Sequence, residues 1–254
     1  MRSSKVIAIA NQKGGVGKTT TAVNLGASLA IAERRVLLVD LDPQGNATSG
    51  VGAKREPGAG SYAVLMGGSL ASDVIRKTDL SFLDVIPSDV DLAGAEVELV
   101  DLPDREWRLR RALEPVVGEY EFVLIDCPPS LGLLTVNALT AATSVLIPVQ
   151  CEYYAMEGLS RLLETIARLQ AINPTLAIEG ILLTMYDPRN NLSVQVASEV
   201  RTHLGGQVFD AIIPRNVTLA EAPSHGKPVL LYQVASRGAQ VYMQLAKEVL
   251  RRTV

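Results

Sequence analysis

The sequence contains few of the residues from which disulfide frameworks, metal clusters and nucleophilic triads are built. Its 254 residues include two cysteines, two histidines and one tryptophan. Two cysteines cannot form a disulfide framework or a four-cysteine metal site. We therefore expect Cys127 and Cys151 to be buried, reduced thiols in a cytoplasmic protein, which argues against an iron–sulfur protein. His203 and His225 lie in no recognisable nucleophile pattern, and neither is assigned a role.

Long hydrophobic runs are also absent. No apolar stretch approaches the roughly 20 residues of a membrane-spanning helix. Only five consecutive apolar residues precede Asn11, too few for the core of a signal peptide. The composition, 48% hydrophobic and 20% charged, is typical of a compact globular protein and excludes a disordered chain.

Short β-branched runs alternate with longer segments of helical periodicity, and no repeat or linker divides them. The predicted strands are Val6–Ala10, Val36–Val39, Phe122–Ile125, Val145–Val149, Ile178–Leu183 and Val208–Ile213; the predicted helices include Thr20–Ala32, Asp104–Leu113, Leu159–Ile172 and Val194–Leu204. Ala47–Gly60, with four glycines and a proline, is predicted to be an exposed loop. The pattern predicts one α/β domain over residues 1–254, with a twisted, mostly parallel sheet and helices on both faces.

The segment Asn11–Thr20 (NQKGGVGKTT) lies directly after the first predicted strand and before a helix. Glycines let backbone N–H groups face phosphate oxygens, and the helix directs its positive N-terminus to the same place. We expect Lys18 to reach the β- and γ-phosphates and the Thr19 hydroxyl to bind Mg²⁺. The segment thus predicts a P-loop NTPase fold. The residues expected to bind nucleotide are Lys13, Gly14, Gly15, Val16, Gly17, Lys18, Thr19 and Thr20.

The loop departs from the common pattern G-x-x-x-x-G-K-[ST]. Gln12 stands where that pattern has its first glycine, and Lys13 follows it. A second lysine folded back into its own loop would crowd Lys18, so we expect Lys13 to point toward the nucleotide of a second subunit. The loop KGGVGKTT resembles that of the deviant Walker A family of dimerising ATPases. The resemblance implies that Lys13 crosses the dimer interface.

Five further segments narrow the resemblance. They are VLLVDLDPQG (36–45), FVLIDCPP (122–129), LIPVQCEYYAMEGL (146–159), IPRNVTLAEAPSHGKPV (213–229) and SRGAQVY (236–242). With the loop, they span nearly the whole chain and are similar to segments of the ParA/Soj chromosome-partitioning ATPases. The resemblance implies a slow, Mg²⁺-dependent ATPase that forms a homodimer with ATP and binds double-stranded DNA non-specifically. It also implies a centromere-binding ParB-type partner that stimulates hydrolysis and resets the dimer to monomers.

Acidic residues follow two of the predicted strands. Asp126 ends one, so its carboxylate should emerge beside the phosphate loop and hold Mg²⁺ through a water molecule. Asp40 and Asp42 end the neighbouring strand, and phosphoryl transfer needs one carboxylate that orients the attacking water. The resemblance assigns that role to Asp42 and places Asp40 near the outer shell of the metal. A helix cap or a structural hydrogen-bond acceptor is the alternative for Asp40.

The base expected in the site is adenine. The Asn/Thr-Lys-x-Asp segment by which P-loop GTPases read guanine does not occur in the sequence. Pro214 and Asn216 match positions that hold adenine in the resembling family, and an asparagine side chain offers both a donor and an acceptor. The alternative is that Asn216 stabilises a turn.

Charge is unevenly distributed along the chain. Residues 1–200 hold 17 basic and 24 acidic side chains, whereas residues 201–254 hold 7 basic and 3 acidic ones. The C-terminal excess indicates either solvated surface residues or a face that binds a polyanion. Because the loop opens at residue 13, we expect no N-terminal helix-turn-helix domain, and the ATPase surface would contact nucleoid DNA. The candidate contacts are Arg201, Arg215, Arg237 and Lys247, with Arg251 and Arg252 as further contributors.

Two other functions compete with this prediction. A membrane-associated positioning ATPase similar to MinD would share the loop and use a C-terminal amphipathic helix. Residues 240–252 form such a helix, with Val241, Leu245 and Val249 on one stripe. Packing against the sheet explains the stripe better, so no stable membrane association is expected. A module that only binds nucleotide is disfavoured by the acidic residues after the strands.

Overall fold

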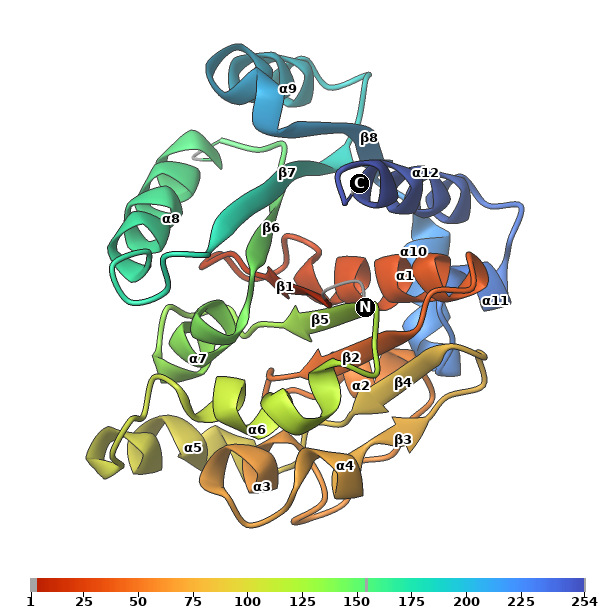
Figure 1. Cartoon of the computed structure of the whole chain (residues 1–254). Helices are drawn as coiled ribbons and strands as arrows, with labels where there is room; N and C mark the ends of the chain where they lie inside the picture. Colours follow the sequence, from red (N-terminus) through yellow and green to blue (C-terminus); the bar gives the residue numbers. More distant parts are fainter. Residues whose placement is uncertain (1–3, 154, 254) are drawn as a thin grey trace.

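A computed structural model describes residues 4–153 and 155–253, and in that part the strands form one eight-stranded sheet (Figure 1). The strand order is β3-β4-β2-β5-β1-β6-β7-β8. Neighbouring strands are parallel except for β3, which runs antiparallel to β4 at one edge. The strands are β1 (Lys5–Ile9), β2 (Val36–Asp40), β3 (Arg76–Lys77), β4 (Leu83–Ile86), β5 (Phe122–Asp126), β6 (Ser144–Gln150), β7 (Ala177–Tyr186) and β8 (Val208–Pro214).

Helices cover both faces of the sheet (Figure 1). Alternate residues of β1 enter two separate cores, Val6 and Ala8 on one face and Ile7 and Ile9 on the other, as the period of two of a strand requires. Helices α3, α6, α7, α8 and α9 pack on the first face, and α1, α11 and α12 on the second. The α-helices are α1 (Lys18–Ile31), α2 (Asn46–Gly50), α3 (Ser61–Met66), α4 (Ala71–Val74), α5 (Leu92–Glu98), α6 (Arg108–Val117), α7 (Leu133–Ala141), α8 (Ala155–Leu169), α9 (Asn191–Leu204), α10 (Val217–Glu221), α11 (Val229–Tyr232) and α12 (Arg237–Arg251); 3₁₀ turns lie at η1 (Leu99–Asp101), η2 (Gly205–Gln207) and η3 (Ala222–His225).

The register of the central strands brings their carboxyl ends to one edge. Asp126 of β5 pairs with Ile9 of β1 on one side and with Asp40 of β2 on the other. The chain leaves β1 directly into the glycine loop that precedes α1. In parallel sheets ligands bind outside the carboxyl ends of the strands, which is where the loop and the two aspartates meet.

The predicted α/β architecture is confirmed, and each predicted strand is present within one to three residues of its predicted bounds. β2, for example, extends to Asp40, which places that carboxylate on the strand instead of after it. The hydrophobic periodicity therefore located the central sheet correctly.

Two segment predictions are wrong. Ala47–Gly60 is not an exposed loop throughout, because Asn46–Gly50 forms α2 and its Ala47 and Thr48 are fully buried. The amphipathic helix starts at Arg108 instead of Asp104, because the Asn137 side chain from α7 accepts the N–H of Leu109 and fixes the first turn. Strands β3 and β4 and the helices α3, α4, α5, α7, α10 and α11 were not predicted.

Candidate phosphate-binding and hydrolysis site

The loop between β1 and α1 is held open by two glycines in the left-handed region. Gly15 has φ 72° and Gly17 has φ 89°, a conformation that favours glycine at both positions. The Thr184 hydroxyl of β7 donates to the carbonyl of Val16 at 2.9 Å and fixes the loop from outside. The predicted phosphate loop therefore lies at the N-terminus of the fourteen-residue helix α1, where backbone N–H groups have no helical partner.

The two lysines of the loop lie in different environments. Lys18 is buried and its Nζ donates to the carbonyl of Lys13 at 3.2 Å. Burial lowers the pKa of Lys18, while the nearby Asp126 opposes this shift. Lys13 instead turns outward to Glu152, with 3.4 Å between Nζ and Oε2, and half of its side chain is exposed. This agrees with the expectation that Lys13 does not fold into its own loop.

The Asp126 carboxylate is fully buried, and neither of its oxygens has a hydrogen-bond partner within the described part of the chain. Burial raises the pKa of Asp126 well above its usual value, and the adjacent Asp40 raises it further. The Thr19 hydroxyl and the Lys18 ammonium act in the opposite direction. A buried carboxylate without donors beside a hydroxyl fits a hard divalent cation such as Mg²⁺, whose preferred ligands are oxygens.

Asp40 is held by protein donors instead. Its Oδ2 accepts the N–H of Thr48 at 2.7 Å and the Thr48 hydroxyl at 2.6 Å, and its Oδ1 accepts the N–H of Asp42 at 3.1 Å. Burial raises the pKa of Asp40 to about 6, and the Thr48 hydrogen bonds oppose this shift. Asp40 is thus a structural acceptor, as the alternative held, while its place near the outer shell of a metal stays a prediction.

Asp42 lies two residues beyond β2 with one carboxylate oxygen engaged. Its Oδ1 accepts the N–H of Gln44 at 2.9 Å, while no donor among the described residues reaches Oδ2. The Ser88 hydroxyl donates to the Asp42 carbonyl at 2.8 Å and anchors the backbone. Asp42 can thus accept a hydrogen bond from water at the edge where Lys18 lies.

A cavity of about 220 Å³ opens beside the loop, lined by Gly17 and Thr20 on one side and by Pro214 and Asn216 on the other. Asn216 caps α10, since its Oδ1 accepts the N–H of Leu219 at 3.2 Å. Asn216 therefore both stabilises a turn, as the alternative prediction held, and lines the cavity. Lining from Ile213, Leu219 and Tyr242 makes the cavity suited to a flat, largely apolar group such as a purine base.

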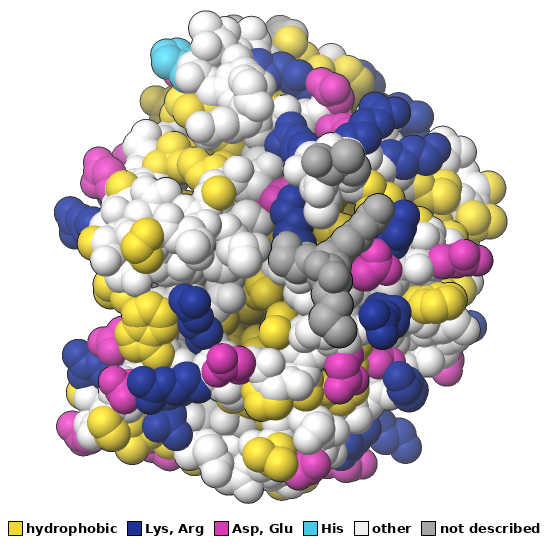
Figure 2. Space-filling view, viewed as in Figure 1, with side chains coloured by type: hydrophobic (Ala, Val, Ile, Leu, Met, Phe, Trp, Pro, Cys, Tyr) yellow, Lys and Arg dark blue, Asp and Glu magenta, His cyan; other side chains and the backbone are white. Residues whose placement is uncertain are grey.

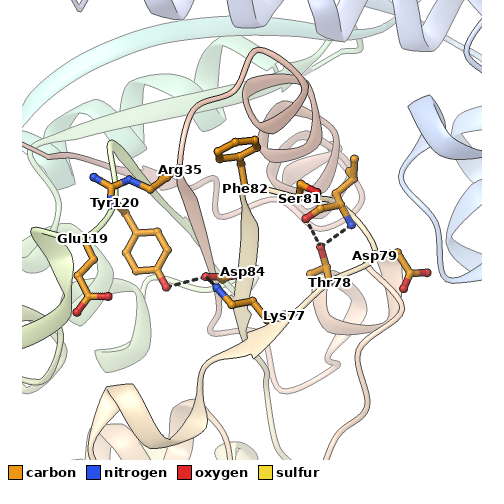
Figure 3. Close-up of a pocket in the computed structure, with 10 residues that line it drawn as sticks. Arg35, Lys77, Thr78, Asp79, Ser81, Phe82, Asp84, Glu119 and Tyr120 are labelled. Atoms are coloured by element: carbon orange, nitrogen blue, oxygen red, sulfur yellow. Dashed lines mark hydrogen bonds and ion pairs between the residues drawn. The ribbon is translucent and has the colours of Figure 1, made fainter.

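A larger cavity, of about 520 Å³, lies at the opposite edge of the sheet (Figure 3). Its lining residues lie near the amino ends of β2, β4 and β5, whereas the phosphate loop lies at the carboxyl ends of the strands. Three acidic residues line it, Asp79, Asp84 and Glu119, and the buried one, Asp84, already accepts hydrogen bonds from Lys77 at 2.8 Å and Tyr120 at 2.9 Å. With its buried charge compensated and no glycine loop beside it, this cavity offers no phosphate site.

The candidate DNA contacts do not share one environment. Arg215 is exposed and lies 3.6 Å from Glu152, whereas Arg201 is half-buried and donates to the carbonyl of Phe209. Arg237 and Lys247 are exposed at separate turns of α12, and Arg252 stacks on the Phe209 ring. Figure 2 shows several Lys and Arg side chains gathered over the region of α12. Arg201 and Arg252 thus have structural contacts of their own.

The stripe of the C-terminal helix is buried. Val241, Leu245 and Val249 belong to the core between α12 and the sheet, which confirms that the stripe packs inside the protein. Among the described residues no helix is both long and apolar enough to cross a bilayer. Cys127 and Cys151 are also buried, as predicted, and burial raises the pKa of Cys151 to about 11.

Sequence reasoning missed several residues that position the site. Thr184, Thr48 and Ser88 hold the loop, Asp40 and the Asp42 backbone through their hydroxyls. A threonine inside the apolar run of β7 is the signal that could have identified Thr184. Arg189, whose side chain is 88% exposed and pairs with Asp187, was also missed. The carbonyl of Tyr186, at the end of β7, accepts the N–H of Arg215.

Comparisons with known proteins identify the family of the chain. A family model described as an AAA domain matches residues 4–178. The chain is 60% identical over 247 residues to the sporulation initiation inhibitor protein Soj of Bacillus subtilis (strain 168), covering 96% of this chain and 98% of Soj. It is 56% identical over 250 residues to the chromosome partitioning protein ParA of Myxococcus xanthus (strain DK1622), covering 98% of this chain and 88% of ParA.

Two solved structures extend the comparison. Cobyrinic acid a,c-diamide synthase from Mycobacterium smegmatis, with bound ADP and magnesium, is 41% identical with a TM-score of 0.85, covering 98% of this chain and 95% of that one. The cell division ATPase MinD of Pyrococcus furiosus is 27% identical with a TM-score of 0.81, covering 98% and 99%. From the family match and the two curated relatives, the chain belongs to the Soj/ParA family of chromosome-partitioning ATPases.

Proposed function

We propose that this chain is a nucleotide-driven switch that partitions chromosomes or plasmids. With Mg²⁺ and ATP, two copies form a dimer that binds double-stranded DNA of any sequence, and hydrolysis returns the dimer to monomers. The observation that carries the proposal is the buried Asp126 carboxylate, which has no donor among the described residues and lies beside Thr19 and Lys18 of the phosphate loop. Such an arrangement binds a metal–triphosphate complex.

The chemistry divides among the residues of this edge. Backbone N–H groups at the start of α1 hold phosphate oxygens, and Lys18 adds a positive charge. Thr19 and Asp126 would hold Mg²⁺, which neutralises phosphate charge when bound. The free Oδ2 of Asp42 accepts a hydrogen bond from the attacking water and orients it. Asp40 supports Asp42 by accepting the Asp42 N–H, and the Thr48 hydroxyl holds Asp40 in place.

The nucleotide is ATP in this proposal. The cavity that Pro214 and Asn216 line starts at Gly17, at the end of the phosphate loop, so a base and its phosphates would be bound side by side. The Mycobacterium relative was also solved with an ATP analogue and magnesium. Its name refers to a different reaction, whereas the relatives at 56% and 60% identity are named for partitioning and sporulation control.

Dimerisation uses Lys13 in this proposal. Its ion pair with Glu152 is long and exposed on both sides, so breaking it costs little free energy. Lys13 can therefore leave Glu152 and reach phosphates of the partner subunit. The Lys13 side chain points away from its own phosphate loop, toward Glu152, and this orientation also supports a contact with the partner subunit.

DNA and protein partners complete the cycle. Exposed Arg215 and Arg237 would contact phosphates. Phosphate contacts carry no sequence information, so the protein would bind the nucleoid in the cytoplasm non-specifically. A ParB-type protein would stimulate hydrolysis. The buried stripe of α12 leaves this helix without an apolar face for a membrane, so we expect no stable membrane association.

Sedimentation of the purified protein with Mg²⁺ and ADP, with ATP, and with ATP plus duplex DNA tests the proposal. We expect a monomer with ADP, a dimer with ATP, and co-sedimentation with DNA only in the third mixture. Pelleting with liposomes in the presence of ATP is the matched arm for the membrane alternative. A monomer in every mixture, or ATP-dependent pelleting with liposomes instead of DNA, would contradict it.

A further inference from the structure

The segment that carries Asp42 is held from below by an arginine of the following loop. Arg55 Nη2 donates to the carbonyls of Pro43 at 2.7 Å and Asp89 at 2.9 Å, and its Nη1 reaches the carbonyl of Gln44 at 3.3 Å. One side chain thus ties residues 43 and 44 to the chain that follows β4. The loop around Arg55 is mostly exposed, but the guanidinium turns inward.

Gly45 makes this contact possible. It has φ 67°, and a Cβ placed there would lie 2.7 Å from Cδ of Arg55, closer than real Cβ atoms come to other atoms. The segment 43–45 and the Arg55 side chain therefore pack in direct contact. No other residue than glycine fits at position 45 without displacing the arginine.

The hydrogen bonds that Arg55 donates all go to backbone carbonyls. Within the described part of the chain no carboxylate lies within ion-pair distance of Arg55, and its Nε is buried without a hydrogen-bond partner. Burial raises the pKa of the nearby Asp89 carboxyl, and the charge of Arg55 opposes this shift. Burying half of a guanidinium costs free energy unless its N–H groups find hydrogen-bond acceptors. Those contacts lie at the two residues directly after Asp42.

A short chain of bonds links Arg55 to the Asp42 carboxylate. Arg55 fixes the carbonyls of Pro43 and Gln44, and the Gln44 N–H donates to Oδ1 of Asp42 at 2.9 Å. Movement of residues 43 and 44 would therefore rotate or release this carboxylate. Misplacing a catalytic group by about 1 Å can reduce a rate on the order of 100-fold.

We propose that Arg55 is a positioning residue for ATP hydrolysis, which acts by holding Pro43 and Gln44 so that Asp42 faces the attacking water. This rests on the proposed role of Asp42. The hydrogen bonds of Arg55 reach neither the phosphate loop nor the residues that line the base cavity, so we expect nucleotide binding to be independent of it.

The test compares Arg55→Ala, Arg55→Lys and the exposed neighbour control Lys54→Ala. For each, single-turnover ATP hydrolysis and the dissociation constant for ATP are measured separately. We expect Arg55→Ala to hydrolyse ATP about 10- to 100-fold more slowly with a dissociation constant within about twofold of the wild type. Arg55→Lys, which retains a cation for one carbonyl, should recover part of the rate, and Lys54→Ala should match the wild type.

A double-mutant cycle with Asp42→Asn separates positioning from a general structural role. If Arg55 acts through Asp42, adding Arg55→Ala to Asp42→Asn slows hydrolysis no further. Wild-type turnover in Arg55→Ala, parallel loss of ATP binding, or additive effects in the cycle would each overturn the inference. Wild-type turnover in Asp42→Asn would instead refute the role of Asp42 in the proposed function. Should Arg55→Ala not fold, the rate and affinity of Arg55→Lys decide the question in the same way.

Discussion

Asp126 shows at the scale of one residue how a site for a cation costs stability when the cation is absent. Its buried carboxylate has neither a hydrogen bond nor an ion pair in the described structure, and burial raises its pKa well above the usual value. Between the ordinary pKa of aspartate, which holds in the unfolded chain, and the raised folded value, only the folded state keeps the proton. Stability from this group therefore falls as the pH rises through that window.

We predict that Asp126→Asn stabilises the metal-free, nucleotide-free protein at neutral pH by about 1–3 kcal/mol, since an amide costs neither the burial of a charge nor the uptake of a proton on folding. The gain should shrink as the pH falls toward the ordinary aspartate pKa of 3.8, because the carboxyl becomes protonated in both states only below it. Urea unfolding of both proteins in EDTA between pH 4 and pH 8 measures it. The same variant should lose stabilisation by Mg²⁺–ATP. Equal stability of the two proteins at every pH would contradict the account.

Asn216 joins two roles that substitutions can separate. Its Oδ1 caps α10, while its side chain lines the cavity beside the loop. Asn216→Ser retains a capping oxygen but removes the amide group, so we expect normal unfolding and weaker ADP binding, by about tenfold. Asn216→Ala should lose ADP affinity and, in addition, about 1 kcal/mol of stability. Calorimetric titration with ADP and thermal unfolding measure the two effects. Wild-type ADP affinity in Asn216→Ser would remove the residue from base recognition.

At the scale of elements, the phosphate loop assigns different tasks to its two lysines. Lys18 is buried next to the acidic pair, while Lys13 is exposed and bound loosely to Glu152. One lysine lies inside the site and the other outside it. Removing each should therefore affect different steps.

We predict that Lys18→Ala weakens ATP binding at least 100-fold, because it removes the cation inside the loop. Lys13→Ala should bind one ATP per chain with an affinity within about threefold of wild type but remain monomeric. Fluorescent-nucleotide titration and light scattering after gel filtration measure binding and mass. Normal ATP-dependent dimerisation of Lys13→Ala would exclude a contact across the interface.

The elements that the sequence predicted share strong local signals. The central strands are apolar runs, and the loop has a distinctive order of glycines, lysine and threonine, so both could be located before the structure. Short elements such as α2 and β4 could not, because tertiary contacts specify them. Thr48 folds α2 over Asp40 through two hydrogen bonds, and Asn137 moves the start of α6 to Arg108.

The site residues likewise divide into those with a local sequence signal and those specified by tertiary contacts. Asp40, Asp42 and Asp126 could be identified because they end apolar strands, and the register of β2 and β5 confirms that Asp40 and Asp126 are adjacent. Their supporting partners come from distant loops. Nothing near Arg55 in the sequence indicates that it reaches back to the carbonyls of residues 43 and 44.

At the scale of the whole molecule, the question is how one weakly acidic chain could bind a polyanion, as the proposed function requires. The net charge is −3, but the C-terminal 54 residues hold seven basic and three acidic side chains. Dimerisation would double any cationic surface. DNA binding would then depend on ATP. The two copies together would also offer two sets of phosphate contacts.

We predict that Arg215→Glu and Arg237→Glu each weaken binding of the ATP dimer to every duplex sequence. Loss of one phosphate contact per subunit should reduce the slope of log affinity against log salt by about two units for the dimer. Arg35→Glu, at the opposite edge of the sheet, is the matched control and should bind as the wild type does. Salt titrations with unrelated duplexes measure this. Unchanged slopes in both variants, or strong preference of the wild type for one sequence, would contradict the proposed DNA-binding surface.

The most direct test of the central claim is the mass and nucleotide content of Asp42→Ala after incubation with Mg²⁺ and ATP. The phosphate loop and Asp126 remain intact in this variant, so it should bind ATP, whereas the water-orienting carboxylate is gone. We predict a persistent dimer that contains ATP, while the wild type under the same conditions returns to monomers with ADP. Formation of ADP by Asp42→Ala at the wild-type rate would contradict the account.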